Sequence, residues 1–292
     1  MQSLNFTTMF MFRRVGTLMI VLLLSALMVQ IAAQEETPEP VPTSPSPDEF
    51  DVQVLVPEIL SVRPHDTGSF TQGLLLHTDG FFYESDGGSV INGDQSSLRR
   101  VDPQTGEVLQ QVDLLTDYFA EGLALVDDRL IQLTWRSNFA IVYERETFEP
   151  VEIFQYSGEG WGLCYDGSDL YMSDGSSRIT RRDSQTFQPL GSYEVTLYGI
   201  PVEDLNELEC VGDHVYANVW QTDTILQIDK FSGVVTAVID ASDLLTDAER
   251  SQMPSSATLN GIAYDPENEV FFITGKLWAQ MFEVRFIPAA GE

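Results

Sequence analysis

From Val52 onward, short apolar runs alternate with tight turn signals. Stretches such as "HTDGFFYES" and "YDGSDLYMSD" join an Asp-Gly pair to a short apolar strand. This pattern is typical of antiparallel strands joined by hairpin turns. Long amphipathic helical patterns are missing, and the best candidate is a single short helix around residues 244–253. We therefore expect an all-β fold.

Five segments of this region share one shape: a polar or aromatic residue, then Gly or Leu, then an apolar strand. They are "TQGLLLHTDG", "AEGLALVDD", "GWGLCYDGSD", "NELECVGD" and "LNGIAYDPEN". Measured between Gly73, Gly122, Gly162, Leu208 and Gly261, the steps are 49, 40, 46 and 53 residues. Each step has room for four short strands. Such a radial repeat predicts a five-bladed β-propeller.

Two further patterns support this prediction. A turn of the form D-x-x-T/S-G/F recurs in "DPQTGEV", "ERETFEP", "DSQTFQP" and "DKFSGVV". The strand "FDVQVLVPEILSVRP", residues 50–64, precedes the first repeat and has no unit of its own. We expect it to close the ring by pairing with the last blade, near "MFEVRF".

The residue before the first strand of each unit is the main functional candidate. In a propeller these strands line the central channel, so the preceding residues meet at the channel mouth. Most such positions have structural roles. Here the set is polar and aromatic, and consists of Gln72, Glu121, Trp161, the Asn206–Glu207 pair and Asn260.

Glu121 is the acid of this set that has aromatic neighbours, with Phe119 before it and Trp135 after its strand. One interpretation is a carboxylate that accepts hydrogen bonds from backbone N–H groups of the next loop. The other is a carboxyl group whose pKa is raised by apolar surroundings, so that it can take and give a proton near neutral pH.

All four tryptophans recur in comparable places: Trp135, Trp161, Trp220 and Trp278. They can pack between blades or form an aromatic box around a ligand. The chain has only two lysines, Lys230 and Lys276, and Lys276 lies between Gly275 and Trp278. Lys276 is a candidate to stabilise developing negative charge, and Asn206 offers an amide for the same purpose.

Composition excludes several classes of function. The net charge is -30 and there is no basic stripe, so nucleic acid is a poor partner. No G-x-S-x-G motif is present. His65, His77 and His214 lie in unrelated contexts, and Cys/His spacing of the metal-binding type is absent. These features argue against a serine hydrolase and against a His-bound catalytic zinc; His65 is better explained by a turn or entry loop.

The N-terminus has the layout of an export signal. The first 34 residues contain no acid, and Arg13 and Arg14 precede an apolar run over 15–28. An uncleaved membrane anchor is the alternative. We expect an exported protein with four parts: a signal peptide or signal anchor at 1–33, a disordered Pro/Glu/Ser-rich tether at 34–51, the propeller at 52–288, and a tail at 289–292. Cys164 and Cys210 can pair or stay free.

The motifs resemble those of a known family, the plant and bacterial glutaminyl-peptide cyclotransferases, which are five-bladed propellers unrelated to the zinc-dependent animal enzyme. Nine segments in order carry the resemblance from His65 to Trp278: "HDTGSFTQGL", "YFAEGL", "LTWRS", "EGWGLCYDG", "LYMSDGS", "LNELE", "YANVWQTD", "LNGIAYD" and "TGKLW". Ala120 stands where the family usually has Gly, and Cys164 where Thr is common.

The resemblance implies conversion of N-terminal glutamine of peptides or proteins to pyroglutamate, with loss of ammonia and without a metal or cofactor. It implies that Glu121 is the acid/base. The implied substrate pocket consists of Phe70, Gln72, Phe119, Trp135, Trp161, Asn206, Trp220 and Lys276. We assign Glu121, Lys276 and Asn206 to catalysis and expect a monomer.

Two other functions remain open at this point. A calcium-dependent propeller lactonase or esterase needs several Asp, Asn or Glu oxygens around a channel metal. Glu121, Asn206, Glu207 and Asn260 are the candidates. A non-catalytic propeller that binds peptides keeps the aromatic box but has no need for Glu121.

Overall fold

The computed structural model describes residues 52–88 and 95–290, and nearly all of its regular structure is β-strand. The predictions for the signal segment, for the tether and for the last two residues of the tail lie outside the described residues. Across the described ranges, no helix is both long and apolar enough to span a membrane.

Three sheets each consist of four consecutive antiparallel strands. The first group contains β2 (Thr71–Leu76), β3 (Phe82–Asp86), β4 (Ser97–Val101) and β5 (Val108–Asp113). The second contains β6 (Ala120–Val126), β7 (Arg129–Thr134), β8 (Phe139–Glu144) and β9 (Pro150–Gln155). The third contains β10 (Leu163–Tyr165), β11 (Asp169–Ser173), β12 (Arg178–Asp183) and β13 (Pro189–Glu194).

The fourth sheet has eight strands and divides into two similar halves. The fourth group contains β16 (Leu205–Val211), β17 (His214–Val219), β18 (Thr224–Asp229) and β19 (Val235–Asp240). The fifth contains β20 (Leu259–Asp265), β21 (Val270–Gly275), β22 (Gln280–Pro288) and, as its outer strand, β1 (Gln53–Pro64). A small hairpin, β14 (Thr196–Leu197) with β15 (Ile200–Pro201), precedes β16.

Strand β1 joins the two ends of the folded region. It pairs antiparallel with β22 from Leu55–Pro288 to Pro64–Gln280. Its first residues also pair parallel with β19, which merges the fourth and fifth groups into one sheet. The prediction that this strand closes the ring against the last blade is therefore confirmed for residues 53–64.

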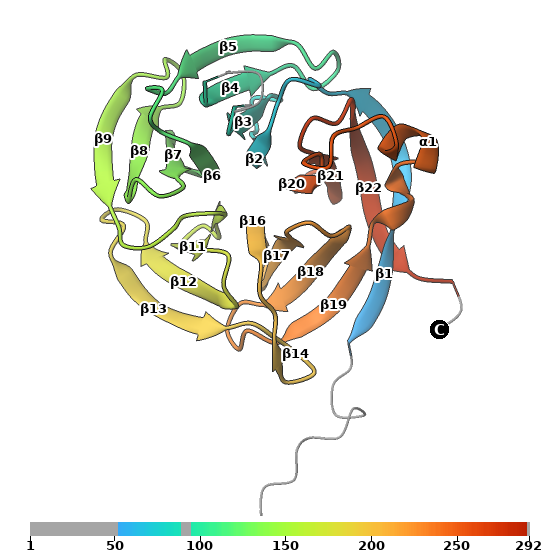
Figure 1. Cartoon of the computed structure of the whole chain (residues 1–292). Coiled ribbons are helices and arrows are strands. Elements are labelled where there is room, and N and C mark those ends of the chain that lie inside the picture. The colour runs from blue at the N-terminus through green and yellow to red at the C-terminus, as the bar shows by residue number, and fades with distance from the viewer. Residues whose placement is uncertain (1–51, 89–94, 291–292) are drawn as a thin grey trace, which may run out of the picture. The chain divides into compact units, whose positions relative to one another are not determined.

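The innermost strands form a closed circuit around the centre. Strand β2 contacts β6, β6 contacts β10, β10 contacts β16, β16 contacts β20, and β20 contacts β2. Figure 1 shows β2, β6, β16 and β20 toward the middle, with β5, β9, β13 and β19 at the periphery. The propeller prediction is confirmed, and the described ranges contain five groups of strands arranged around the centre.

Apolar side chains fill the spaces between neighbouring groups. For example, Leu123 and Leu130 of the second group pack with Leu75 and Tyr83 of the first. The other clusters of the described residues bridge the remaining pairs of groups in the same way. Hydrophobic burial of this kind holds each group against its neighbours and leaves the channel mouth to polar residues.

The repeated D-x-x-T/S-G/F turn joins the third and fourth strands of a group. Asp102 Oδ1 accepts hydrogen bonds from the backbone N–H groups of Gln104 and Thr105. Gly106 then adopts a positive φ of 69°. The same position in the other three turns is also left-handed, at Phe148, Phe187 and Gly233.

The predicted helix at 244–253 is shorter than expected. The structure has a 3-10 helix η2 (Ser242–Leu244) and one turn of α-helix α1 (Asp247–Arg250). Thr246 and Glu249 form a capping box that starts α1. Leu244 and Leu245 are buried in the core before α1 begins, so the apolar pattern reflects packing of the loop.

Cys164 in β10 and Cys210 in β16 form a disulfide with a Cα–Cα distance of 5.4 Å. The sequence left this pairing open. The bond joins the innermost strands of the third and fourth groups, close to two residues of the central cavity described next.

Candidate active site

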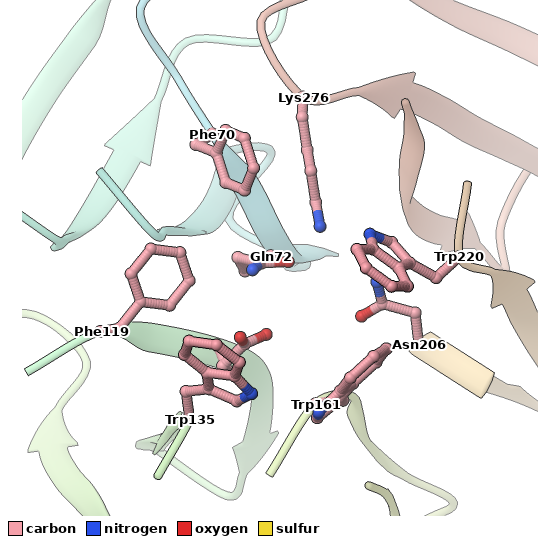
Figure 2. Close-up of a pocket in the computed structure, with 9 residues that line it drawn as sticks. Phe70, Gln72, Phe119, Trp135, Trp161, Asn206, Trp220 and Lys276 are labelled. Atoms are coloured by element: carbon pink, nitrogen blue, oxygen red, sulfur yellow. The ribbon is translucent and has the colours of Figure 1, made fainter. Parts of the chain in front are cut away.

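A cavity of about 200 Å³ lies at the centre of the ring of strands (Figure 2). The structure brings together all nine residues that the sequence proposed for catalysis and substrate binding. They are Phe70, Gln72, Phe119, Glu121, Trp135, Trp161, Asn206, Trp220 and Lys276.

All five groups contribute to this cavity because of strand direction. In each group the first and second strands are antiparallel, so the start of one and the end of the other lie at the same edge. Gln72, Glu121 and Asn206 lie at the start of β2, β6 and β16. Three further residues follow the second strand of their group: Trp135, Trp220 and Lys276.

Irregular pairing turns these side chains toward the channel. The register between first and second strands shifts at Thr71/Gly73, Ala120/Leu123 and Leu205/Leu208. Each shift includes a cavity residue: Gln72, Glu121 or Asn206. A bulge leaves extra residues unpaired and redirects a side chain. The fifth group has the same shift at Leu259/Ile262.

Glycine lets the innermost strands approach each other closely. A Cβ on Gly122 would lie 2.5 Å from the backbone N of Leu163. A Cβ on Gly162 would lie 2.1 Å from the Asn206 carbonyl oxygen. The Gly122 N–H donates to the Trp161 carbonyl at 2.7 Å. The glycines after Glu121 and Trp161 are therefore required by the close approach of the inner strands.

Glu121 is the acid of the cavity, and its residue is only 4% exposed. Within residues 52–88 and 95–290 its carboxyl group makes no hydrogen bond, so it does not cap a backbone loop. Burial raises the pKa of Glu121 well above its ordinary value, the Lys276 ammonium opposes this shift, and the Glu159 carboxylate adds to it. The environment favours a carboxyl group that exchanges its proton at accessible pH.

Lys276 is the cation of the cavity. It is 2% exposed, and its Nζ lies 4.9 Å from the centre of the Phe70 ring. Burial lowers the pKa of Lys276 to about 8, although the Glu121 carboxylate acts in the opposite direction. The other lysine, Lys230, does not line the cavity. Its Nζ instead lies 2.9 Å from Asp166 Oδ2.

Two amides complete the polar lining. Asn206 is 2% exposed, and its Oδ1 has no hydrogen-bond partner among the described residues. Gln72 Oε1 accepts a weak hydrogen bond from Asn260 Nδ2 at 3.4 Å. Since buried polar atoms are nearly always paired, the free Asn206 oxygen indicates a place for a ligand donor.

Aromatic rings form the walls. The ring centres of Phe70 and Phe119 lie 6.2 Å apart, and those of Phe119 and Trp135 lie 5.9 Å apart. On the other side, Trp161 and Trp220 meet edge to face at 5.5 Å. Figure 2 shows the five rings around the space between Lys276 and Asn206.

Other candidates from the sequence lie outside this lining. Asn260 donates to the Thr71 carbonyl at 2.9 Å. Trp278 is fully buried and packs onto Gly275, so it is a core residue. His65 joins the loop before β22 to strand β3, because Nδ1 lies 2.8 Å from the Trp278 carbonyl and Nε2 lies 3.1 Å from Glu84.

Only two of the four residues proposed for a calcium site, Glu121 and Asn206, line the cavity. Both carboxylate oxygens of Glu207 accept backbone hydrogen bonds, from Leu74 at 3.3 Å and from Ile262 at 2.9 Å. In the described ranges no group of three or more His, Cys, Asp or Glu side chains is arranged to hold a metal ion. This geometry gives no specific support to the lactonase interpretation.

Sequence reasoning missed Glu159, which contacts the walls from outside. Its carboxylate accepts hydrogen bonds from the indoles of Trp135 and Trp161 and from Arg136. The residue is part of the "EGWGL" segment, but only Trp161 of that segment was selected. An acid two residues before a channel-mouth tryptophan was the available signal.

The fold and the site define a propeller enzyme of the glutamine cyclotransferase class. Residues 22–286 match the glutamine cyclotransferase family, and the chain belongs to it. The glutaminyl-peptide cyclotransferase of Arabidopsis thaliana is 37% identical over 238 residues, which cover 80% of this chain and 72% of that protein. The glutaminyl cyclase of Myxococcus xanthus has 40% identity and a TM-score of 0.75, with 82% of this chain and 99% of the other covered.

Proposed function

We propose that this protein converts the N-terminal glutamine of peptides and proteins to pyroglutamate and releases ammonia. The observation that carries the proposal is Glu121, a buried carboxyl group without a hydrogen bond to any described residue, inside an aromatic cavity that also holds a buried lysine. The membership of the chain in the glutamine cyclotransferase family supports the same reaction.

The reaction needs no nucleophile from the protein. The neutral α-amine of the substrate attacks the Cδ of its own side-chain amide, and a new N–Cδ bond closes the five-membered ring. The old bond from Cδ to the amide nitrogen then breaks, and that nitrogen leaves as ammonia. A model α-amine has a pKa of about 7.7–8.0, so part of it is neutral at pH 7.

The protein's first task is to fold the glutamine side chain back onto its amine, which is a proximity effect. A cavity of about 200 Å³ is smaller than the roughly 300–1,000 Å³ of sites for drug-sized ligands. It therefore suits a single residue held between rings such as Phe119, Trp135 and Trp161. The rest of the peptide extends out of the channel mouth.

The second task is to move one proton. Glu121 takes this proton from the attacking amine and gives it to the departing amide nitrogen. Glu121 therefore serves first as base and then as acid. A carboxyl group with an ordinary pKa is too weak a base for this purpose. Burial raises the pKa of Glu121 and brings it closer to neutral pH.

The third task is to stabilise the oxyanion that forms at the amide oxygen. Lys276 is a donor without a hydrogen-bond partner in the described ranges, so we place it at the oxyanion. Asn206 has a free acceptor oxygen, which suits an N–H of the substrate. Gln72 lies beside them and offers a further amide.

The direct test follows ammonia release from a Gln-initiated dipeptide by purified protein, with and without EDTA. Release of one ammonia per pyroglutamate formed is expected, and an N-acetylated glutamine peptide is the control because its nitrogen cannot attack. If no Gln-initiated peptide releases ammonia, the proposal is wrong. Loss of activity in EDTA would favour a metal-dependent reaction.

Trp161→Ala tests the aromatic cage. Trp161 is half-buried, and the loss of its apolar contact with the substrate is expected to cost about 1.5–3 kcal/mol, so KM should rise about 10- to 100-fold with a smaller change in kcat. Phe231→Ala is the matched control, because Phe231 is 70% exposed and lies in an outer turn. Steady-state kinetics with a Gln-initiated dipeptide measure both variants. Unchanged saturation in Trp161→Ala would count against the cage.

Lys276→Met tests the oxyanion role. Loss of one oxyanion donor is expected to lower kcat about 100-fold. Because burial lowers the pKa of Lys276 to about 8, the parent's kcat should decline as the pH rises through this value and the ammonium loses its proton. The variant carries no such proton and should lack this decline. A variant with the parent's kcat at pH 7 would remove Lys276 from the mechanism.

We also propose that the protein is exported and acts as a monomer. The acid-free N-terminal segment supports export. The Cys164–Cys210 disulfide is consistent with an oxidising compartment outside the cytosol. Cell fractionation with N-terminal sequencing of the product tests both export and cleavage after Ala33, and light scattering tests the oligomeric state.

A further inference from the structure

Glu159 contacts two walls of the cavity although it does not line the cavity itself. Its Oε2 accepts hydrogen bonds from Trp135 Nε1 at 2.7 Å and from Trp161 Nε1 at 3.0 Å. In Figure 2 the nitrogens of these two indoles are turned toward the gap between the rings. One carboxylate thus joins a wall of the second group to a wall of the third.

The other carboxylate oxygen holds a cation at the rim. Glu159 Oε1 accepts a hydrogen bond from Arg136 Nε at 2.7 Å. The Arg136 guanidinium lies 3.7 Å from the centre of the Trp135 ring and covers one face of it. Both oxygens of Glu159 therefore accept hydrogen bonds. Two of the three donors are wall tryptophans, and the third, Arg136, covers a wall tryptophan.

The backbone gives Glu159 a defined position. The N–H of Gly160 donates to the Trp135 carbonyl at 3.0 Å. A Cβ on Gly160 would lie 2.5 Å from Tyr156 Oη, so glycine is required for this close approach. Tyr156 Oη in turn donates to the Thr134 carbonyl. The segment before β10 is thus attached to the end of β7.

Glu159 is an anion at neutral pH. Burial alone raises the pKa of Glu159, but the hydrogen bonds from Trp161, Arg136 and Trp135 outweigh this effect and hold the pKa below its ordinary value. Hydrogen bonds to the charged form favour it. A fixed negative charge therefore lies behind the two indoles.

Two charged side chains act on Glu121. Lys276 of the fifth group favours its ionised form, and Glu159 disfavours it. Tyr156 stays neutral, because burial raises its pKa to about 12. The charge of Glu159 is therefore the main repulsive contribution to Glu121 from another side chain.

We propose that Glu159 is a positioning residue, which holds Trp135 and Trp161 as walls of the glutamine cage and supplies a fixed negative charge that acts on Glu121. This inference rests on the proposed cyclotransferase activity. It assigns no bond-breaking step to Glu159, whose effects reach the substrate through the two indoles and through Glu121.

Glu159→Gln in the full chain is the test. The amide keeps the shape but loses the charge. Its single oxygen can accept from the two indoles at the place of Oε2, or from Arg136 at the place of Oε1, but it cannot serve both places, because the NH₂ group does not accept from an N–H. Glu146→Gln is the matched control, because it removes one negative charge from the same group at a side chain that is 79% exposed. Circular dichroism and thermal unfolding show whether each variant is folded.

The expected result is a rise in KM of about 3- to 10-fold for a Gln-initiated dipeptide in Glu159→Gln, with kcat changed less than KM. The limb of the kcat/KM profile that belongs to Glu121 should move to lower pH, because a repelling charge is gone. Glu146→Gln should match the parent in both respects. Parent-like KM and pH profile in Glu159→Gln would overturn the proposal, whereas an inactive parent would instead overturn the cyclotransferase function.

Trp161→Phe tests the same contact without a change in the acid. The phenylalanine keeps a ring in the wall but lacks the N–H that donates to Glu159. The rise in KM is therefore expected to be smaller than that of Glu159→Gln. Combined with Glu159→Gln, the effects should be less than additive, since both changes act on the hydrogen bond between Glu159 and Trp161. Additive effects, or no effect of Trp161→Phe, would contradict the role of this bond.

Discussion

Glu121→Gln is expected to lower kcat by about 10²- to 10⁴-fold and to leave the fold intact. Glutamine has nearly the same shape but cannot carry the proton from the attacking amine to the leaving nitrogen. No hydrogen bond is lost, because the Glu121 carboxyl group makes none with the described residues. Substrate should still bind, so KM is expected to change far less than kcat.

The same variant has a distinct pH dependence of stability. Burial raises the pKa of Glu121 above its ordinary 4.5, so the folded protein keeps this proton where the unfolded chain has released it. The free energy of unfolding of the parent therefore falls as the pH rises from about 4.5 through the folded-state pKa. Glu121→Gln lacks this decline and should be at least as stable as the parent at pH 7.

Turnover of a Gln-initiated dipeptide and urea unfolding between pH 4.5 and 8 measure the two effects. Glu146→Gln again serves as the control for loss of a carboxylate, and its turnover should equal that of the parent. A Glu121→Gln variant as active as the parent would remove this residue from the mechanism. A variant that is inactive because it is unfolded would show no cooperative unfolding transition.

Replacement of both Cys164 and Cys210 by alanine is expected to lower the free energy of unfolding by about 4 kcal/mol. The bond closes a loop with a sequence separation of 46 residues, and the loss of chain entropy in the unfolded state gives this magnitude. Cys164 in β10 and Cys210 in β16 follow Trp161 and Asn206 by three and four residues, but neither cysteine lines the cavity. At 25 °C kcat and KM should stay close to those of the parent.

Urea unfolding with and without dithiothreitol checks this expectation. The reductant should shift the midpoint of the parent to that of the double variant and should have no effect on the variant itself. Equal midpoints for the parent in both conditions would show that the bond contributes nothing to stability. A large loss of turnover in the folded variant would show that the bond also positions the cavity.

The fold was predictable because its signals are local and repeated. The D-x-x-T/S-G/F turns can be recognised from sequence alone, because each has an acidic side chain at the start (Asp in three turns and Glu144 in the fourth) and a left-handed residue at the end. The strand at 50–64 belongs to no repeat, so we expected it to pair with the last repeat. The helix at 244–253 was overestimated, because the apolar residues 244 and 245 look the same in a helix as in a buried loop.

The site was predictable to the level of the nine lining residues, because family motifs and channel-mouth positions agree. Asn260 and Glu207 are in equivalent places but are used inside the structure, as donor to Thr71 and as acceptor from Leu74 and Ile262. Trp278 resembles Trp135 and Trp220 in its position after a strand. Only the contact with Gly275 shows that it belongs to the core.

By itself, the sequence determined the repeat, the turns, the closing strand and the types of residue at the channel mouth, because each depends on spacing within one short segment. The tertiary structure decided which of these residues share a cavity, that Cys164 pairs with Cys210, and that Glu159 holds two tryptophans. These features depend on contacts between groups of strands some 40 to 50 residues apart and on bulges that redirect side chains. Local periodicity carries no information on these contacts or on the bulges, because the closure of the ring sets which inner strands become neighbours.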